Sequence, residues 1–190
     1  RLWPTAALWT STAEQDRLVE TWQLVSQHFR GNPAVAGYDL LNEPSETFPG
    51  RMGAKVVSLY DRLYHTIRAI DPDHIIIMEA IWWWDTLPNP QENNWENVIY
   101  SLHYYQWKNN EDFTVMKNAV DGWIQDAQKW GSKYNVPHFI GEFTLFENAE
   151  SWNYGLQQFT ETGSHWTTWS YKVVGRNNWG MYNAAEQNNV

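Results

Sequence analysis

The sequence predicts an α/β fold in which short parallel strands alternate with helices. Apolar runs of strand length alternate along the chain with longer segments whose apolar residues recur at helical spacing. Each apolar run also ends, always at its carboxyl end, in polar or aromatic residues. Helices of about ten residues or more between short buried strands are typical of parallel sheets, because a parallel connection needs a crossover.

Four segments show the periodicity and the boundary residues of helices. They are residues 11–31, 50–70, 112–134 and 149–162. Ser11 or Thr12 can cap the first of them, and Gly31-Asn32-Pro33 stops it. Asp71-Pro72-Asp73 ends the second in the same way.

Five shorter apolar segments are expected to be strands. They are residues 34–41, 74–78, 97–102, 137–142 and 165–170. A loop rich in Trp and Asn is expected at 82–96, and the tail from Tyr171 onward looks like a loop. The sequence shows no internal repeat and no linker, so we expect residues 1–190 to form one domain or a piece of a larger one.

Composition limits the partners of this chain. A formal net charge of -9 argues against nucleic acid, which needs a basic face. The chain has no cysteine, and no apolar run is long enough to span a membrane. Because the chain begins with Arg1 and not Met, we expect it to be processed, nicked or excerpted.

Tryptophan is the unusual residue, with 14 copies. An indole offers a flat apolar face with a polar edge, which suits a sugar, although an aromatic core is the ordinary alternative. The run Trp82-Trp83-Trp84 cannot point inward at every position of a regular element. We therefore take Trp83 as a candidate substrate contact.

Functional side chains follow each predicted strand at its carboxyl end. In chain order they are Asn42 and Glu43, then Glu79, then His103 and Tyr105, then Glu142, and finally Trp169 and Lys172. In a βα barrel, side chains from different strands converge at this end, which is the catalytic face. Turn chemistry alone would favour Gly, Asn and Asp over Glu, His and Trp.

Two glutamates on separate strands suit the hydrolysis of glycosides. One carboxyl group protonates the leaving oxygen and the other attacks the anomeric carbon, and their separation decides between retention and inversion. Tyr105 and His103 can donate hydrogen bonds on the nucleophile side, and Asn42 can hold the sugar 2-hydroxyl.

Simpler interpretations of the same residues stay open. Glu43 can be a solvated turn residue, Glu79 an ordinary salt-bridge partner, and His103 a satisfied histidine at a strand end. A metal site of His103, Glu43 and Glu142 is the weaker hypothesis, because the helices hold no His-x-x-x-His pair and the chain has no Cys.

Several of these segments resemble glycoside hydrolase family 5, the cellulase family. "GYDLLNEP" resembles its acid/base motif on strand four, "LHYY" its His-x-Tyr on strand six, "FIGEF" its nucleophile motif on strand seven, and "WTTWSYK" its strand eight. The resemblance covers about residues 3–182.

The resemblance implies a role for each matching residue and a (β/α)8 TIM barrel. Glu43 would be the acid/base and Glu142 the nucleophile, with Asn42, His103, Tyr105 and Trp169 in support. It also implies a retaining mechanism without a cofactor.

The chain departs from the family pattern in one respect, because it matches only the fourth to eighth strands. Five parallel strands cannot close such a barrel. We therefore expect a second polypeptide or segment that carries the first three βα units, or an inactive fragment if nothing replaces them.

The sequence thus predicts a retaining endo-β-glycosidase, with β-1,4-glucan as the expected substrate. A β-mannan, a β-1,3-glucan or a glycolipid remains an alternative, as does a carbohydrate-binding protein on an inactive barrel. An extracellular location is expected from the substrate class alone.

Overall fold

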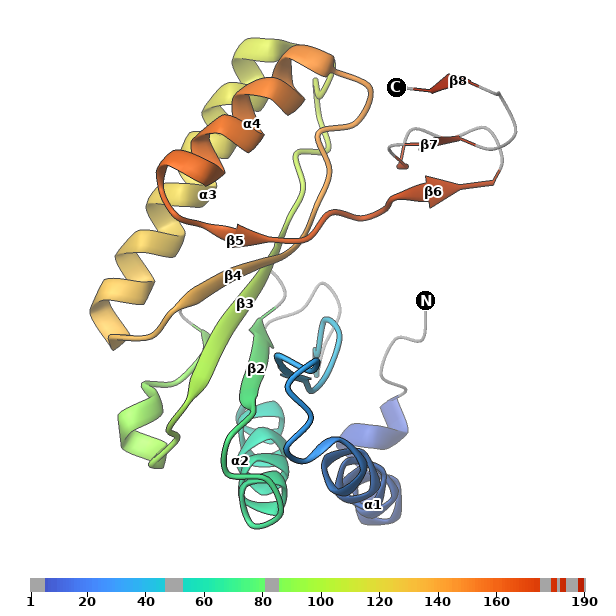
Figure 1. Cartoon of the computed structure of the whole chain (residues 1–190), viewed down its shortest axis with the longest axis vertical. Helices are drawn as coiled ribbons and strands as arrows, with labels where there is room; N and C mark the ends of the chain where they lie inside the picture. The colour runs from blue at the N-terminus through green and yellow to red at the C-terminus, as the bar shows by residue number, and fades with distance from the viewer. Residues whose placement is uncertain are drawn as a thin grey trace. The chain divides into compact units, whose positions relative to one another are not determined.

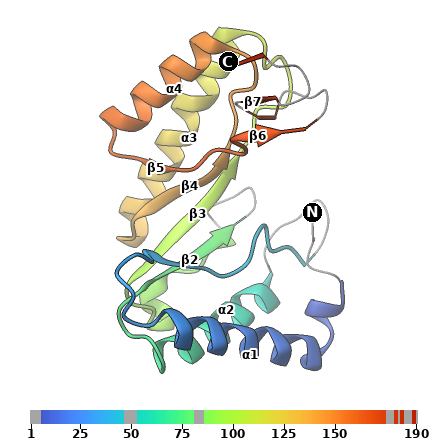
Figure 2. The same ribbon diagram turned by 45° about the vertical axis from the view of Figure 1, so that its right-hand side comes forward.

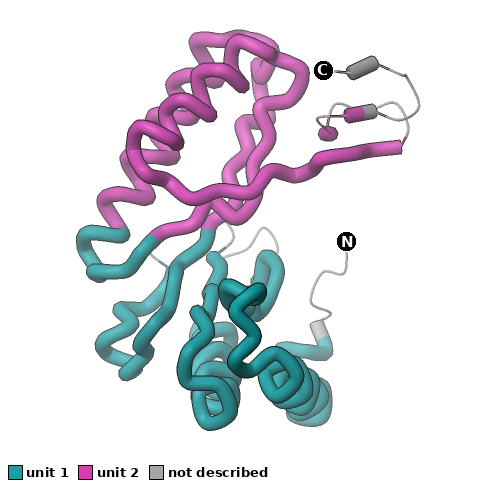
Figure 3. The backbone as a smooth tube through the Cα atoms, in the orientation of Figure 1, with its two compact units in different colours: residues 1–101, 131–137 teal, residues 102–130, 138–190 magenta. Residues whose placement is uncertain are grey.

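The structure is a computed structural model that describes residues 6–46, 53–80, 86–174, 179–180, 182–183 and 188–189. The chain divides into two compact units, shown in Figure 3. Unit 1 comprises residues 1–101 and 131–137, and unit 2 comprises residues 102–130 and 138–190. Strand β3 and helix α3 each contribute residues to both units.

Unit 1 combines parallel strands with helices. In chain order its elements are η1 (Ala6–Trp9), α1 (Thr12–Phe29), β1 (Gly37–Asp39), α2 (Ala54–Arg68), β2 (Ile75–Ala80), η3 (Pro90–Asn93) and the first part of β3 (Val98–Tyr104). Strand β1 pairs with β2 in parallel, with Gly37 opposite Ile75. Helices α1 and α2 lie side by side in Figures 1 and 2.

The two helices of unit 1 begin with different caps. The Ser11 side chain accepts the Glu14 amide, as expected for α1, and Gly31 follows the helix with a φ of 70°. Gly53 at the start of α2 has no side chain to offer. The Glu46 carboxylate replaces it and accepts the amides of Lys55 and Val56, at 2.6 and 3.0 Å.

The core of unit 1 lies between α2 and the strands. The buried residues of α2 recur at helical spacing, and they are Val56, Leu59, Tyr60, Leu63, Tyr64 and Ile67. They belong to the same apolar core as Tyr38, Ile76 and Met78 of the strands. This periodicity is the one that the sequence showed.

A buried polar cluster joins the starts of β1 and β2. The Asp71 carboxylate accepts the Tyr38 hydroxyl at 2.6 Å, and Nδ1 of His74 lies 2.6 Å from the same oxygen. Burial opposes the ionisation of Asp71, but the bonds from Tyr38 and from the amides of His74 and Asp73 outweigh it and lower its pKa to about 2. The carbonyl of Asn32, and then Asp71, raise the pKa of His74.

Unit 2 has a parallel strand pair covered by helices. Its elements include the end of β3, most of α3 (Phe113–Tyr134), β4 (His138–Phe143), α4 (Ala149–Glu161) and β5 (His165–Trp166). Strand β4 pairs with β5 in parallel, with Phe139 opposite His165. Helices α3 and α4 lie side by side in both views (Figures 1 and 2). The buried core includes Met116, Val120, Ile140, Phe143 and Phe159.

The sheet has five strands in the order β1-β2-β3-β4-β5, which confirms the predicted parallel α/β class. Strands β1 and β5 are shorter than the sequence suggested, at three and two residues. Beyond β1, the pairing continues with one bond from the Leu40 amide to the Ile77 carbonyl.

The tail was expected to be a loop, and that expectation is wrong in part. Strands β6 (Lys172–Val173), β7 (Tyr182–Asn183) and β8 (Asn188–Asn189) form a small second sheet. Each strand is only two residues long, too short for period-two patterning to reveal it. No helix among the described residues is long and apolar enough to cross a membrane.

We expect Asp71→Asn to lower the free energy of unfolding by about 3 kcal/mol near pH 5, since His74 loses its buried charge partner. Urea unfolding measures this, and Asp73→Asn is the matched control because its exposed side chain lies outside the cluster. Because folding lowers the pKa of Asp71, its ionised carboxylate stabilises the fold at pH values above the ordinary pKa of an aspartate. This stability is lost as the pH falls toward about 2. The difference between wild type and variant should therefore shrink below pH ~4, and a constant difference would refute the assignment.

Candidate active site

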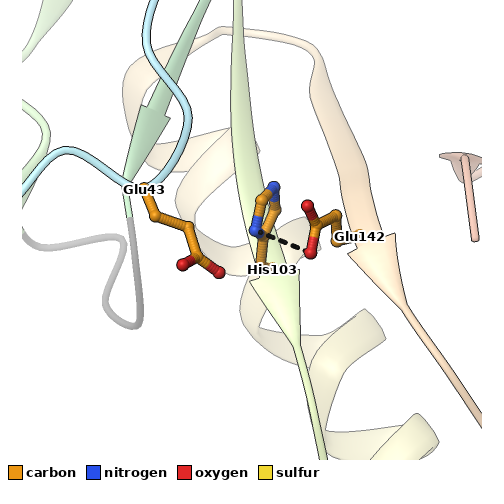
Figure 4. A group of neighbouring side chains, drawn as sticks. All are labelled: Glu43, His103 and Glu142. Carbon is orange, nitrogen blue, oxygen red and sulfur yellow. Dashed lines mark ion pairs between the residues drawn. The ribbon is translucent and has the colours of Figure 1, made fainter. Parts of the chain in front are cut away.

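The carboxylate of Glu142, in β4, is held by two side chains from the end of β3 and the loop that follows. The Tyr105 hydroxyl donates to Oε2 of Glu142 at 2.6 Å. Nδ1 of His103 lies 3.4 Å from the same oxygen and forms an ion pair with it when the ring is protonated. Figure 4 shows the imidazole and the carboxylate pointing toward each other.

This arrangement fixes the direction of the Glu142 carboxylate, because two side chains bind the same oxygen. His103 is 3% exposed and Glu142 remains partly accessible, so the buried ring supports a carboxylate that a ligand can still reach. His103 is thus a buried histidine at the end of β3 that has the Glu142 carboxylate as its partner.

Glu43 lies in unit 1, on the turn after β1, and is 6% exposed. Its backbone has a φ of 46°, in the left-handed region that residues other than glycine rarely adopt. Its amide donates to Oε1 of Glu79 at 2.6 Å. Glu43 is thus a buried, conformationally fixed residue and not a solvated turn residue.

The remaining predicted site residues have different surroundings. Asn42 is exposed beside Glu43. Trp169 is 48% exposed, and its amide donates to the carbonyl of Phe143, so it extends the β5 edge next to β4. Lys172 is exposed, and its ammonium lies 5.6 Å from the centre of the Tyr182 ring. Trp83 lies outside the described residues.

An aromatic cluster beside Glu142 was not foreseen. The rings of Trp107 and Trp179 pack against the ring of Tyr105 and against each other. The ring of Phe146 packs against both tryptophans, and all these ring centroids lie 5.1 to 6.5 Å apart. Trp107 is 51% exposed. It follows the His-x-Tyr segment by two residues, which was the available signal. Trp179 lies in the tail, where no periodicity pointed to a function.

The loop after β4 brings Phe146 into this aromatic cluster. Phe146 has a φ of 53°, and the Thr144 hydroxyl accepts its amide at 3.1 Å. The indole N–H of Trp152 in α4 donates to its carbonyl at 2.7 Å. The backbone amide and carbonyl of Phe146 are therefore both bonded, which keeps its ring in the aromatic cluster.

The comparisons with known proteins agree with the fold and the motifs. The cellulase family, glycosyl hydrolase family 5, matches residues 2–175. An endoglucanase of Paenibacillus polymyxa is 28% identical over 166 residues, covering 72% of this chain and 41% of that protein. An endoglycoceramidase of Cyanea nozakii is 25% identical over 180 residues, covering 84% of this chain and 34% of that protein.

A similar solved structure is endo-glycoceramidase II from Rhodococcus sp., with a TM-score of 0.71 and 20% identity. The superposition covers 96% of this chain and 47% of that one. The chain thus spans less than half the length of these relatives.

Parallel strands with carboxylates at their carboxyl ends are the arrangement that βα-barrel glycoside hydrolases use. Within that class, this chain belongs to the cellulase family, glycosyl hydrolase family 5. The resemblance found in the sequence is therefore confirmed, as is the barrel-type fold, of which the chain supplies five strands.

Proposed function

We propose that this protein is a retaining endo-β-glycosidase that hydrolyses β-glucan, with β-1,4-glucan as the preferred substrate. The observation that carries the proposal is the Glu142 carboxylate in β4, bonded by Tyr105 and paired with His103, in a chain of the cellulase family. A carboxylate oriented by donors and still accessible is suited to attack an anomeric carbon.

In the first step of this mechanism, an oxygen of Glu142 bonds to the anomeric carbon while the glycosidic bond breaks. Glu43 gives its proton to the departing oxygen. In the second step, Glu43 takes a proton from water, and the water oxygen displaces Glu142 from the sugar with overall retention. Retention requires the two carboxyl groups to lie about 5 Å apart.

The printed names of two relatives support the proposal, the first for the substrate and the second for double displacement. The Paenibacillus polymyxa relative is an endoglucanase. One solved structure of the Rhodococcus enzyme is its lactosyl–enzyme intermediate, the covalent species that a retaining mechanism forms. In the aromatic cluster of this chain, Trp107 is 51% exposed and offers ring surface for the apolar face of a sugar.

A β-glycosidic bond of a glycolipid is the second candidate substrate, because the endoglycoceramidase of Cyanea nozakii matches 84% of this chain. Both candidates need the same pair of carboxyl groups, so they differ only in what binds around the reacting bond. We further propose that another segment or polypeptide supplies the barrel strands beyond these five, and that the protein acts outside the cell.

We expect Glu142→Gln and Glu43→Gln to lower kcat/KM for phenyl β-cellobioside, whose leaving group needs a proton, by about 1,000-fold or more. The first loses the nucleophile and the second loses the proton donor. Glu150→Gln, the same change at an exposed site in the first turn of α4, should retain activity.

A 2-fluoro cellobioside inactivator should label the peptide that contains Glu142, as seen by mass spectrometry. Binding of cellobiose without any turnover by the wild type would indicate a carbohydrate-binding protein. A loss of activity in EDTA would instead support the metal hypothesis.

Tyr105→Phe should lower turnover by roughly 10- to 100-fold, because Glu142 loses a donor while the aromatic ring stays in its cluster. Tyr104→Phe is the matched control, since the Tyr104 hydroxyl donates to the carbonyl of Trp123 in α3. Equal losses in the two variants would show that the effect is one of folding.

The substrate class is decided by the rates at which the wild type hydrolyses four substrates, which are carboxymethyl-cellulose, β-mannan, β-1,3-glucan and lactosylceramide. We expect the first to be cleaved fastest, with the anomeric configuration of the new end retained in the NMR spectrum. Faster cleavage of the glycolipid would favour the second candidate and leave the roles of Glu43 and Glu142 unchanged.

A further inference from the structure

We propose that Glu79 is a positioning residue for Glu43, whose buried carboxylate holds the backbone of the proton donor in its left-handed conformation. The inference rests on the proposed function, because it assigns Glu79 a role through Glu43. It replaces the interpretation of Glu79 as an ordinary salt-bridge partner.

The edge of β2 that faces β1 also brings the backbone of Glu79 toward the turn that holds Glu43. The amide of Ile75 and the carbonyl of Ile77 bond to the chain around β1, through Ala36 and Leu40. Alternate residues of a strand present their backbone groups to the same neighbour, so the backbone of Glu79 faces this edge too. At the level of Glu79, the segment that follows β1 is no longer a strand but forms the turn of Asn42 and Glu43.

Tyr60 of α2 takes the place of the missing strand neighbour. Its hydroxyl donates to the Glu79 carbonyl at 2.9 Å and accepts the Glu79 amide at 3.0 Å. Tyr60 is fully buried and Glu79 is 1% exposed. Burial raises the pKa of Tyr60 well above its ordinary value, so the hydroxyl keeps the proton that it donates.

The conformation of Glu43 needs such support. A left-handed backbone costs about 1–2 kcal/mol for a residue with a side chain. The following residue is Pro44, which by itself restricts Glu43 to an extended conformation. A bond from the Glu43 amide to a carboxylate is of the stronger, charge-assisted kind when that group is ionised, and it offsets this cost.

The catalytic consequence concerns the direction of the Glu43 side chain. A turn that relaxed to an ordinary φ would redirect that side chain away from the position set by β1. Proton donation requires correct placement within hydrogen-bond reach of the leaving oxygen. The loss of Glu79 should therefore impair the step that needs a proton and spare a step that does not.

Leaving groups of different basicity separate these two effects. With Glu79→Leu we expect kcat/KM for a phenyl β-glycoside to fall about 10- to 100-fold, and that for a dinitrophenyl β-glycoside to fall less than about 3-fold. Dinitrophenolate departs without a proton. Glu79→Gln, which keeps an acceptor oxygen, should restore part of the loss.

Matched variants control for folding. Tyr60→Phe keeps both carboxyl groups but frees the backbone of Glu79, and it should show the same leaving-group dependence as Glu79→Leu, but weaker. Glu46→Gln alters a carboxylate that accepts the amides of Lys55 and Val56, so it should destabilise α2 without leaving-group dependence.

Amide hydrogen exchange tests the bond without any turnover. The Glu43 amide should exchange about 10-fold faster in Glu79→Leu than in wild type. Its exchange rate in Glu46→Gln should equal that of the wild type. Equal loss on both leaving groups, or unaltered exchange at Glu43, would overturn the inference while Glu43→Gln still abolishes turnover. If Glu43→Gln retains turnover, the proposed function fails instead.

Discussion

Parallel strand pairing is the constraint on which the rest of each unit depends. Strands β1 and β2 pair in parallel in unit 1, and β4 and β5 do so in unit 2. A parallel pair needs a crossover, and α2 and α4 provide it between these strands. Helix α2 buries an apolar stripe in the core of unit 1, and α4 buries Ser151, Gly155 and Phe159 in the core of unit 2. The same pairing brings the carboxyl ends of neighbouring strands to one edge, where side chains far apart in sequence meet.

The two candidate carboxyl groups are controlled in different ways. Glu142 is held through its side chain, by a hydroxyl that donates to its carboxylate and by a buried imidazole beside the same oxygen. Glu43 is held through its backbone amide, by another buried carboxyl group. A nucleophile benefits from a fixed charge, whereas an acid that gives and regains a proton benefits from a fixed position. The local contacts of each residue therefore match the role proposed for it.

Membership of the cellulase family and the five-stranded sheet have a joint consequence. An open parallel sheet leaves backbone groups unpaired at its two edges, which in a closed barrel bond to further strands. The strands β1 and β5 at these edges are also the shortest of the sheet, at three and two residues. A barrel that closes would extend the pairing at both edges, which is the physical basis for proposing a further segment.

The sequence by itself determined the order of helices and strands, the parallel class and the residues at the strand ends. These follow from local periodicity and from boundary residues such as Ser11 and Gly31, which act over one helical turn. The tertiary structure alone decided that Glu79 bonds to the Glu43 amide and that Trp107 packs against Trp179. Such contacts join residues more than 30 positions apart, so their partners depend on strand register and on loop conformation, which no local pattern encodes.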